Sequence, residues 1–353
     1  MSGHVLKLLR EAVGMTQERF AEALGVSVAA VQGWESGRRP LAAMSAGEFS
    51  ALRFTLLRLR APQRLLDALT LAINADQFIG DALTSRPGEV QADAHLLGSW
   101  VVSRPFTGLI VWPLAAIPPD DFPDASSRRG PTPAGPTLSA EERRHLSQHL
   151  QAAAERADRR SEAGLLLARQ TYYLLGFGSS AETAAWLVER YRKDRRIVRS
   201  ERGWSAAWPL ARSTASALTR LGDPEPMRAF IAERLGDDVS ETANLNYWAF
   251  WTGELSGDRL SDSFMAEDPI TAWRGDRLIR HLLDRLTGEL GFIELNIHTL
   301  WALVLARPDL LTPERIRGEL KNHIERLLDE NVVAPRARQE LEALRYGVAI
   351  ATR

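Results

Sequence analysis

Side chains that could bind a charged or a planar polar partner are concentrated in the first forty residues. Gln17 and Gln32 each carry an amide that both donates and accepts hydrogen bonds. The cations Lys7, Arg10, Arg38 and Arg39 accompany them. We expect Gln17 to begin a helix, where backbone N–H groups and the helix dipole favour an anion such as a phosphate. These residue types therefore predict hydrogen bonding and anion binding.

Three short helical segments must position these side chains. Apolar residues between Val5 and Val13 recur at helical spacing. Thr16 is a typical N-cap for the second segment, and Gly25 can end it in the left-handed conformation. Ser27 caps the third segment, which Gly37 closes. Two helices of about eight residues joined by so tight a turn predict a helix-turn-helix.

The segment 16–40 resembles the XRE family of helix-turn-helix proteins, the Cro/C1 type. The residues TQE at 16–18, GVS at 25–27 and WESG at 34–37 all fall in the family's register. The resemblance implies a small all-helical DNA-binding domain with its core at residues 5–40. We expect the helices that follow, at 46–60 and 62–83, to complete this domain over residues 1–83.

The resemblance also implies roles for individual residues. In the family the third helix enters the major groove, so base contacts are expected from Ser27, Val28, Ala29 and Gln32. The Gln32 amide can pair with adenine, while Val28 and Ala29 can pack on thymine methyl groups. Phosphate contacts are expected from Lys7, Arg10, Gln17, Arg38 and Arg39.

Charge limits how tightly one copy of this motif can bind. Residues 1–40 contain five cationic and four anionic side chains, and the net charge of the whole chain is −1. Bulk electrostatics therefore cannot hold nucleic acid, and any contact must come from a local patch. We expect a homodimer, which presents two recognition helices about one helical turn of DNA apart.

The length and composition of the chain fit a globular protein of two or three domains. It has 353 residues, of which 45% are hydrophobic and 25% charged. It has no cysteine, which excludes disulfides, thiolate metal sites and cysteine nucleophiles. We find no secretory signal and no apolar run near the roughly 20 residues that a membrane-spanning helix needs. We therefore expect a cytoplasmic protein with no membrane contact.

The rest of the chain is predicted to be mainly α-helical. Residues 84–117 read as a connecting segment, with a short β-hairpin near 100–112 where β-branched and aromatic residues gather. Residues 118–139 form a Pro-rich linker. From residue 140 to 353 we expect eight to ten helices and no strand, in a domain for sensing or dimerisation. Paired helices of this size are typical of TPR-like repeats, although no residue signature recurs at a fixed period.

Aromatic residues gather in one helical segment of this second domain. The segment contains Asn246, Tyr247, Trp248 and Trp251. Such side chains either fill helix–helix interfaces or line a ligand pocket, in which Asn246 would be a polar handle. The sequence leaves both interpretations open.

Three further patterns fall short of a site. His145 and His149 have a metal-compatible spacing but lack the glutamate of the zinc-protease motif. The glycine pattern at 176–181 follows a predicted helix, whereas a dinucleotide site needs a strand there. The basic run at 190–202 is either a second DNA contact or a solvated helix face. We therefore expect no metal, no cofactor and no enzymatic activity.

These observations together predict a DNA-binding transcriptional regulator. Its partners would be a double-stranded operator, a second copy of the chain, and a small-molecule or peptide effector sensed by the helical domain. The alternative is a helical-repeat interaction scaffold that the helix-turn-helix merely localises on DNA.

Overall fold

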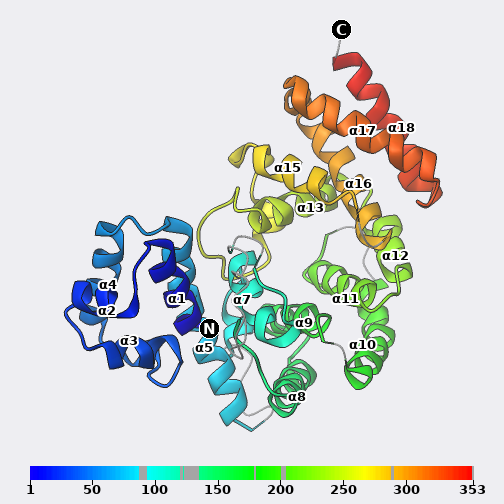
Figure 1. Cartoon of the computed structure of the whole chain (residues 1–353). Helices are drawn as coiled ribbons and strands as arrows, with labels where there is room; N and C mark the ends of the chain where they lie inside the picture. The colour runs from blue at the N-terminus through cyan, green and yellow to red at the C-terminus, as the bar shows by residue number, and fades with distance from the viewer. Residues whose placement is uncertain are drawn as a thin grey trace. The chain divides into compact units, whose positions relative to one another are not determined.

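The computed structural model describes residues 1–86, 94–119, 122, 135–178, 180–199, 204–287 and 290–351. Within these ranges the regular structure consists of eighteen α-helices and three short 3-10 helices, with no strand (Figure 1). The chain divides into two compact units, which we call the N-terminal unit (Met1–Glu89 with Val102–Ala152) and the C-terminal unit (Val90–Val101 with Ala153–Arg353). The prediction of a mainly all-α protein is confirmed.

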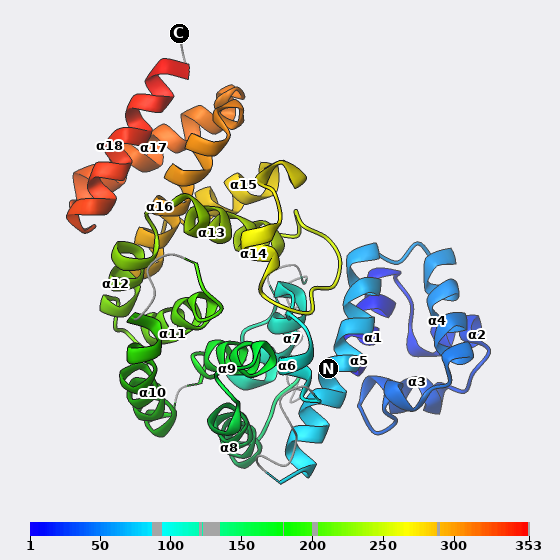
Figure 2. The same cartoon turned by 180° about the vertical axis from the view of Figure 1, so that it is seen from behind.

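Five helices make up the first part of the N-terminal unit (Figure 2). They are α1 (Ser2–Ala12), α2 (Gln17–Leu24), α3 (Val28–Glu35), α4 (Ala46–Arg58) and α5 (Gln63–Thr84), with a 3-10 turn at Leu41–Ala43. Helix α1 packs on α3 and α5, and α2 packs on α3 and α4. Phe20 and Val31 are fully buried between them with Leu6 and Leu9 of α1. This small core fixes α2 and α3 relative to each other.

The ends of α2 and α3 follow from local sequence. The Thr16 hydroxyl accepts a hydrogen bond from the backbone N–H of Arg19 at 3.3 Å, and the Ser27 hydroxyl accepts one from Ala30 at 3.2 Å. Gly25 ends α2 with a φ of 68°, a left-handed conformation that costs glycine little. Both predicted N-caps and the predicted glycine stop are confirmed.

A close approach of two helices holds the end of α3 in place. A Cβ atom on Gly3 of α1 would lie 2.1 Å from the carbonyl oxygen of Trp34. No real Cβ atom tolerates that distance, so a larger residue at position 3 would push α1 away from α3. Helix α1 therefore supports the C-terminal end of α3 directly.

The predicted β-hairpin near residues 100–112 is wrong. Residues Arg104–Ala115 form helix α7, which packs on α5 in the N-terminal unit. Phe106, Leu109 and Ile110 are buried at helical spacing, and Pro105 stands in the first turn, where a missing N–H is harmless. A short apolar run does not by itself distinguish a buried helix from a strand, and packing against α5 decided in favour of the helix.

The predicted Pro-rich linker, residues 118–139, lies largely outside the described residues, so the linker stays a prediction. Helix α8 (Ala140–Arg156) begins at the residue where we expected helical structure to resume. The Ser139 hydroxyl accepts a hydrogen bond from the Glu142 N–H at 3.2 Å and acts as its N-cap.

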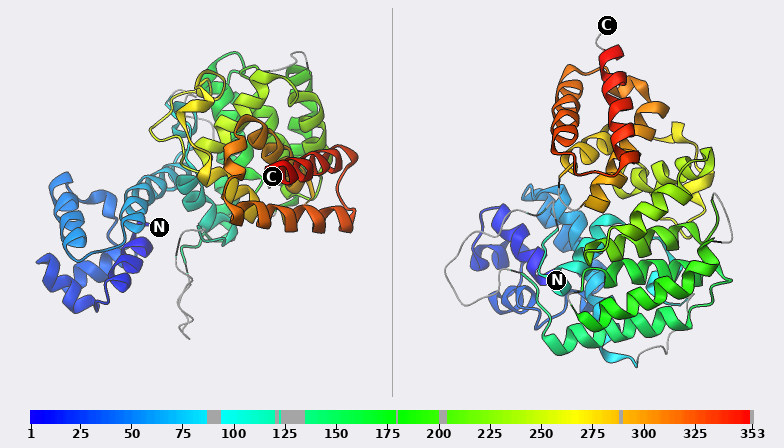
Figure 3. Two further views of the ribbon diagram at one scale, coloured as in Figure 1. Left: turned by 90° about the horizontal axis from the view of Figure 1, so that it is seen from above. Right: turned by 90° about the vertical axis from the view of Figure 1, so that its right-hand side faces the viewer.

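The C-terminal unit consists of helices that pack on near neighbours in the chain, such as α9 on α11 and α17 on α18, while α16 also packs on the more distant α12 and α13 (Figure 3). Its longer helices are α9 (Glu162–Leu175), α10 (Ala181–Arg199), α11 (Trp208–Arg220), α12 (Glu225–Arg234), α13 (Asp238–Trp251), α15 (Asp276–Asp284), α16 (Leu290–Ala306), α17 (Glu314–Glu330) and α18 (Pro335–Ala351). Two one-turn helices, α6 (Leu96–Ser99) and α14 (Phe264–Glu267), complete it with 3-10 turns at Ile270–Ala272 and Pro308–Leu311. The TPR-like repeat remains a prediction. In the described ranges no helix is both long and apolar enough to cross a membrane.

Candidate nucleic-acid interface

The outward face of α3 carries the residues predicted to contact bases. Ser27, Ala29 and Gln32 are exposed and Val28 is half-buried, whereas Ala30 and Val31 point into the core. The helix therefore presents one polar amide and a small apolar surface to solvent. That surface can approach base edges closely, because no bulky side chain stands in the way.

A chain of amide hydrogen bonds joins this face to the start of α2. The Gln32 Nε2 donates to Gln17 Oε1 at 3.3 Å, and the Gln17 Nε2 donates to Glu35 Oε2 at 2.8 Å. Gln17 is half-buried at the first position of α2, where helical N–H groups lack acceptors. The two glutamines are thus held side by side, which fits the predicted pairing of a phosphate contact with a base contact.

Arg10 occupies a different place from the one expected. Its side chain is only 9% exposed, and its Nε donates to Glu35 Oε1 at 2.6 Å. A second donor, Nη1, reaches the Met15 carbonyl at 2.8 Å. The geometry gives Arg10 a structural role and does not favour the predicted phosphate contact. The helical period indicates that Arg10 is on the buried side of α1, because it lies one turn after buried Leu6, but it does not indicate the partner.

Glu35 is the residue that sequence reasoning missed. It ends α3, its side chain is 6% exposed, and it accepts hydrogen bonds from both Arg10 and Gln17. Glu35 therefore ties α1, α2 and α3 together behind the exposed face of α3. Glu35 belongs to the WESG segment of the motif, but its partner Arg10 lies 25 residues away and cannot be recognised from the sequence.

The other predicted phosphate ligands lie nearer to solvent. Arg38 and Arg39 are exposed in the turn after α3, and Lys7 is half-buried on α1. The Arg38 Nε donates to the Ser36 hydroxyl at 3.1 Å. The Arg39 side chain lies over Gly33, where an added Cβ would be only 3.0 Å from Arg39 Cδ. Both arginines are accessible to an anion, and their role as phosphate ligands stays a prediction.

One carboxylate opposes phosphate binding at this surface. Glu18 is fully exposed in the first turn of α2. Hydrogen bonds from its own backbone N–H and from Thr16 lower the pKa of the carboxyl, so it is charged at neutral pH. A negative charge beside Gln17 repels phosphate, which reinforces the expectation that one copy of the motif binds weakly.

The comparisons with known proteins bear on this segment. A family model described as helix-turn-helix, of the XRE type, matches residues 6–45. These residues are an XRE-type helix-turn-helix domain. The chain therefore carries a DNA-binding domain, and a large helical remainder follows it. No curated protein and no solved structure matches the chain. The role of the C-terminal unit must accordingly be inferred from its own residues.

The side-chain amide of Asn246, the possible ligand contact in the C-terminal unit, already forms hydrogen bonds within the protein. The Asn246 Nδ2 donates to the carbonyls of Met265 and Asp268 at 2.9 and 2.7 Å, and its Oδ1 accepts from Trp273 Nε1 at 2.8 Å. These bonds use the amide to fix the chain after α14. The geometry therefore does not favour Asn246 as a ligand contact.

The three aromatic residues predicted beside Asn246 belong to a larger group of rings. Tyr247 and Trp248 are buried, while Trp251 is half-buried. The Tyr247 and Trp251 rings stack with their centroids 6.0 Å apart, and Trp251 meets Tyr173 of α9 edge-on at 5.5 Å. The rings thus join α13 to α9, and one side of the group reaches solvent.

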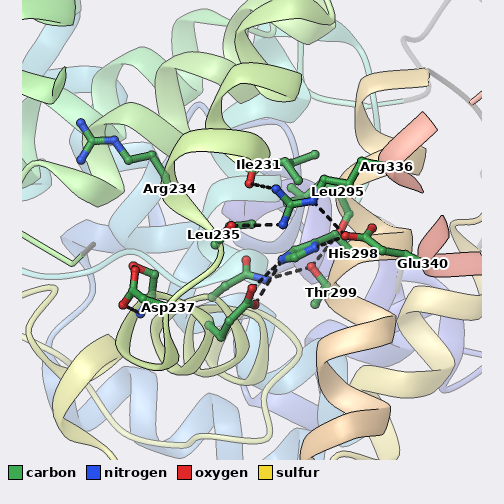
Figure 4. A network of polar contacts seen from close by, with 12 residues as sticks. Ile231, Arg234, Leu235, Asp237, Leu295, His298, Thr299, Arg336 and Glu340 are labelled. Carbon is green, nitrogen blue, oxygen red and sulfur yellow. Dashed lines mark hydrogen bonds and ion pairs between the residues drawn. The ribbon is translucent and has the colours of Figure 1, made fainter. Parts of the chain in front are cut away.

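A second polar network is fully internal to the C-terminal unit (Figure 4). His298 of α16 lies 2.8 Å from Glu340 of α18 through Nδ1 and 2.9 Å from Glu241 of α13 through Nε2. Ionised carboxylates only accept hydrogen bonds, so both ring nitrogens must donate and the imidazole must be charged. Arg336 also donates to Glu340, at 3.0 Å, and to the carbonyls of Ile231 and Leu235.

The two carboxylates outweigh the burial of the histidine. Burial of His298 lowers its pKa, but the hydrogen bonds that the ring donates to Glu241 and Glu340 raise it, and the net direction is upward from the ordinary value of 6.5. The network therefore joins α13, α16 and α18 through one buried cation. It is a structural element with a charge that depends on pH.

The remaining sequence patterns are described only in part, because the side chains of the basic run from residue 195 onward lie outside the described residues, and both interpretations of that run stay open. Gly176 lies at the turn after α9, and a Cβ atom there would be 2.7 Å from Ala217 Cα, so its smallness serves helix packing. In the basic run, Arg190 pairs with Glu155 at 2.5 Å and Lys193 with Glu189 at 3.3 Å. No group of three or more His, Cys, Asp or Glu residues in the described ranges is arranged to hold a metal ion.

Proposed function

We propose that the protein is a cytoplasmic, sequence-specific DNA-binding transcriptional regulator that acts as a dimer and responds to a ligand. The observation that carries the proposal is the face of α3 within a helix-turn-helix domain. It combines an exposed Gln32 with small neighbours and has the cations Arg38 and Arg39 directly after it. That arrangement supplies base readout and phosphate anchoring on one surface.

Dimer formation is part of the proposal because the motif is electrostatically weak. Residues 1–40 contain five cations and four anions. Arg10 is already paired with Glu35, and the charge of Glu18 repels phosphate. Specific complexes typically reach about 10 nM, which one such helix is not expected to provide. A second helix held at a fixed spacing makes its contact nearly intramolecular and raises affinity without new chemistry. The operator would then be two-fold symmetric.

The C-terminal unit supplies the dimer contact and the ligand site in this proposal. It contains about two hundred residues, enough surface for the roughly 1,200–2,000 Å² that a stable interface buries. Its half-exposed aromatic group around Trp251 suits either an interface or a small ligand. A ligand that binds one arrangement of the dimer better than another would shift operator affinity.

Salt dependence tests whether the turn after α3 contacts phosphate. Replacing Arg38 with alanine is expected to lower the slope of log affinity against log salt by about 1, since one phosphate contact is lost per copy of the motif. The control is Arg64→Ala, which removes an exposed arginine from α5 of the same unit and should leave the slope unchanged. Equal slopes for the parent and Arg38→Ala would remove Arg38 from the phosphate contacts.

A further inference from the structure

The C-terminal unit contains a buried guanidinium with no carboxylate partner among the described residues. Arg212, on α11, is 3% exposed, and its Nε has no hydrogen-bond partner in the described structure. Arg169, another strongly buried arginine of this unit, is paired with Asp262 through two bonds of 2.6 and 2.5 Å. Tyr247 forms a side-chain hydrogen bond with Arg212, but its hydroxyl is neutral. Arginine keeps its charge even when buried, so no negative charge in the described part of the unit balances Arg212.

The aromatic rings beside Arg212 balance its positive charge only in part. The Arg212 guanidinium lies 3.7 Å from the centre of the Tyr247 ring and 5.0 Å from that of Trp248. Cation–π contacts are weaker than the cost of burying a charge, so the rings alone do not explain why the cation is there. An anion that enters beside Arg212 would balance the charge.

Two more buried nitrogen atoms on the same helices are hydrogen-bond donors without an acceptor among the described residues. Trp248 Nε1 is buried without a hydrogen-bond partner, and so is Nη1 of Arg220, two turns after Arg212 on α11. Arg220 lies over the rings of Tyr173 and Phe177, at 4.3 and 4.0 Å. Donors without acceptors indicate a ligand that brings acceptors and negative charge.

We propose that this cluster of Arg212, Arg220, Tyr173, Tyr247 and Trp251 binds a small organic anion, in which a carboxylate or phosphate pairs with Arg212 and a flat ring packs against the aromatic side chains. The solvent-facing side of the cluster is formed by half-buried Tyr173, Trp251 and Arg220, so Arg220 attracts the anion toward the inner arginine. The assignment specifies the chemistry of the ligand that the proposed function requires, and it rests on that function for its biological meaning.

Calorimetry on the full-length protein can test the site with three probes of matched shape. Benzoate and phenyl phosphate carry the two candidate acidic groups, and benzamide is the neutral counterpart of benzoate. At least one of the two anions is expected to bind, at least about tenfold more tightly than benzamide, and the tighter of the two identifies the acidic group. Failure of both anions to bind at millimolar concentration, or equal binding of benzamide, overturns the proposal.

Substitutions at Arg212 separate a ligand site from a structural arginine. Arg212→Met should abolish the binding of the anion and should leave the thermal midpoint of the free protein unchanged or higher, because an unbalanced charge has been removed. Arg212→Lys keeps the charge and should weaken the binding without abolishing it. A drop in the midpoint of Arg212→Met, or unchanged anion binding, would show that the arginine serves the fold and would overturn the proposal.

The matched control is Arg259→Met. Arg259 also lies near an aromatic ring, 5.3 Å from the centre of Phe264, but it is paired with Asp268 at 2.8 Å. Its loss should lower the thermal midpoint and leave anion binding intact. These measurements contain no DNA, so a failed anion site would leave the proposed DNA binding standing, and failed DNA binding would leave the anion site standing.

Discussion

Replacing Glu35 with alanine is expected to destabilise the helix-turn-helix domain by about 3–5 kcal/mol. The substitution leaves the guanidinium of Arg10 buried without a counter-charge, and it also removes the acceptor that holds Gln17. Hydrogen exchange of the backbone amides of α1 and α3 in the full-length protein measures this loss locally, without interference from the C-terminal unit. Operator binding should fall with it, because α3 loses its support.

Glu11 provides the matched control for this variant. Its carboxylate also approaches Arg10, at 3.7 Å, but it is 28% exposed, so Glu11→Ala should cost less than about 1 kcal/mol. The double variant Arg10→Met/Glu35→Leu removes both charges and should recover most of the lost stability. If the backbone amides of α1 and α3 are as well protected from hydrogen exchange in Glu35→Ala as in Glu11→Ala, the ion pair between Arg10 and Glu35 does not hold these helices together.

Loss of His298 should have a comparable effect on the C-terminal unit. His298→Ala leaves Glu241 and Glu340 facing a cavity with no cation between them, which we expect to cost about 3 kcal/mol or more in the free energy of unfolding near pH 6. Arg336 still neutralises part of the charge on Glu340. Urea unfolding, monitored by hydrogen exchange of the backbone amides of α16 and α18, measures the difference in the free energy of unfolding between the parent and His298→Ala.

The same network predicts how the difference depends on pH. The pKa of His298 is raised in the folded protein, so its stabilising contribution is fully present below the ordinary pKa of about 6.5. The contribution is lost as pH rises through the raised folded pKa, because the neutral ring can no longer donate to both carboxylates. The advantage of the parent over His298→Gln should therefore shrink above neutral pH. His323→Gln, at a half-exposed histidine of α17 that contacts Arg326, is the control. A parent advantage that stays constant across this range would contradict a charged His298.

Local signals made much of the DNA-binding domain predictable. Thr16, Gly25 and Ser27 fix the ends of α2 and α3 through hydrogen bonds within three residues or through backbone conformation, so a single stretch of sequence contains all the information. The helical spacing of apolar residues in α3 also predicts which of its side chains are exposed. The role of Arg10 could not be predicted in this way, because its partner Glu35 comes close only after α1 has packed against α3.

Tertiary packing explains the other differences from expectation. The β-branched run at 107–111 indicated a strand, but burial against α5 makes it part of a helix. The sequence left open whether Asn246 contacts a ligand, and in the structure three groups up to 27 residues later in the chain bind its amide. Arg212 was not singled out at all, because an arginine without a partner can be recognised only when its surroundings are known.

Selection of binding sites from random duplex DNA by the full-length protein tests the central claim most directly. The parent is expected to enrich one two-fold symmetric site, and Gln32→Ala should lose the preference for adenine at one position in each half-site, a cost of about 1–3 kcal/mol there. Gln63→Ala, at an exposed glutamine of α5, should enrich the same site as the parent. Enrichment of no sequence, or an unchanged site for Gln32→Ala, would contradict readout of DNA by α3.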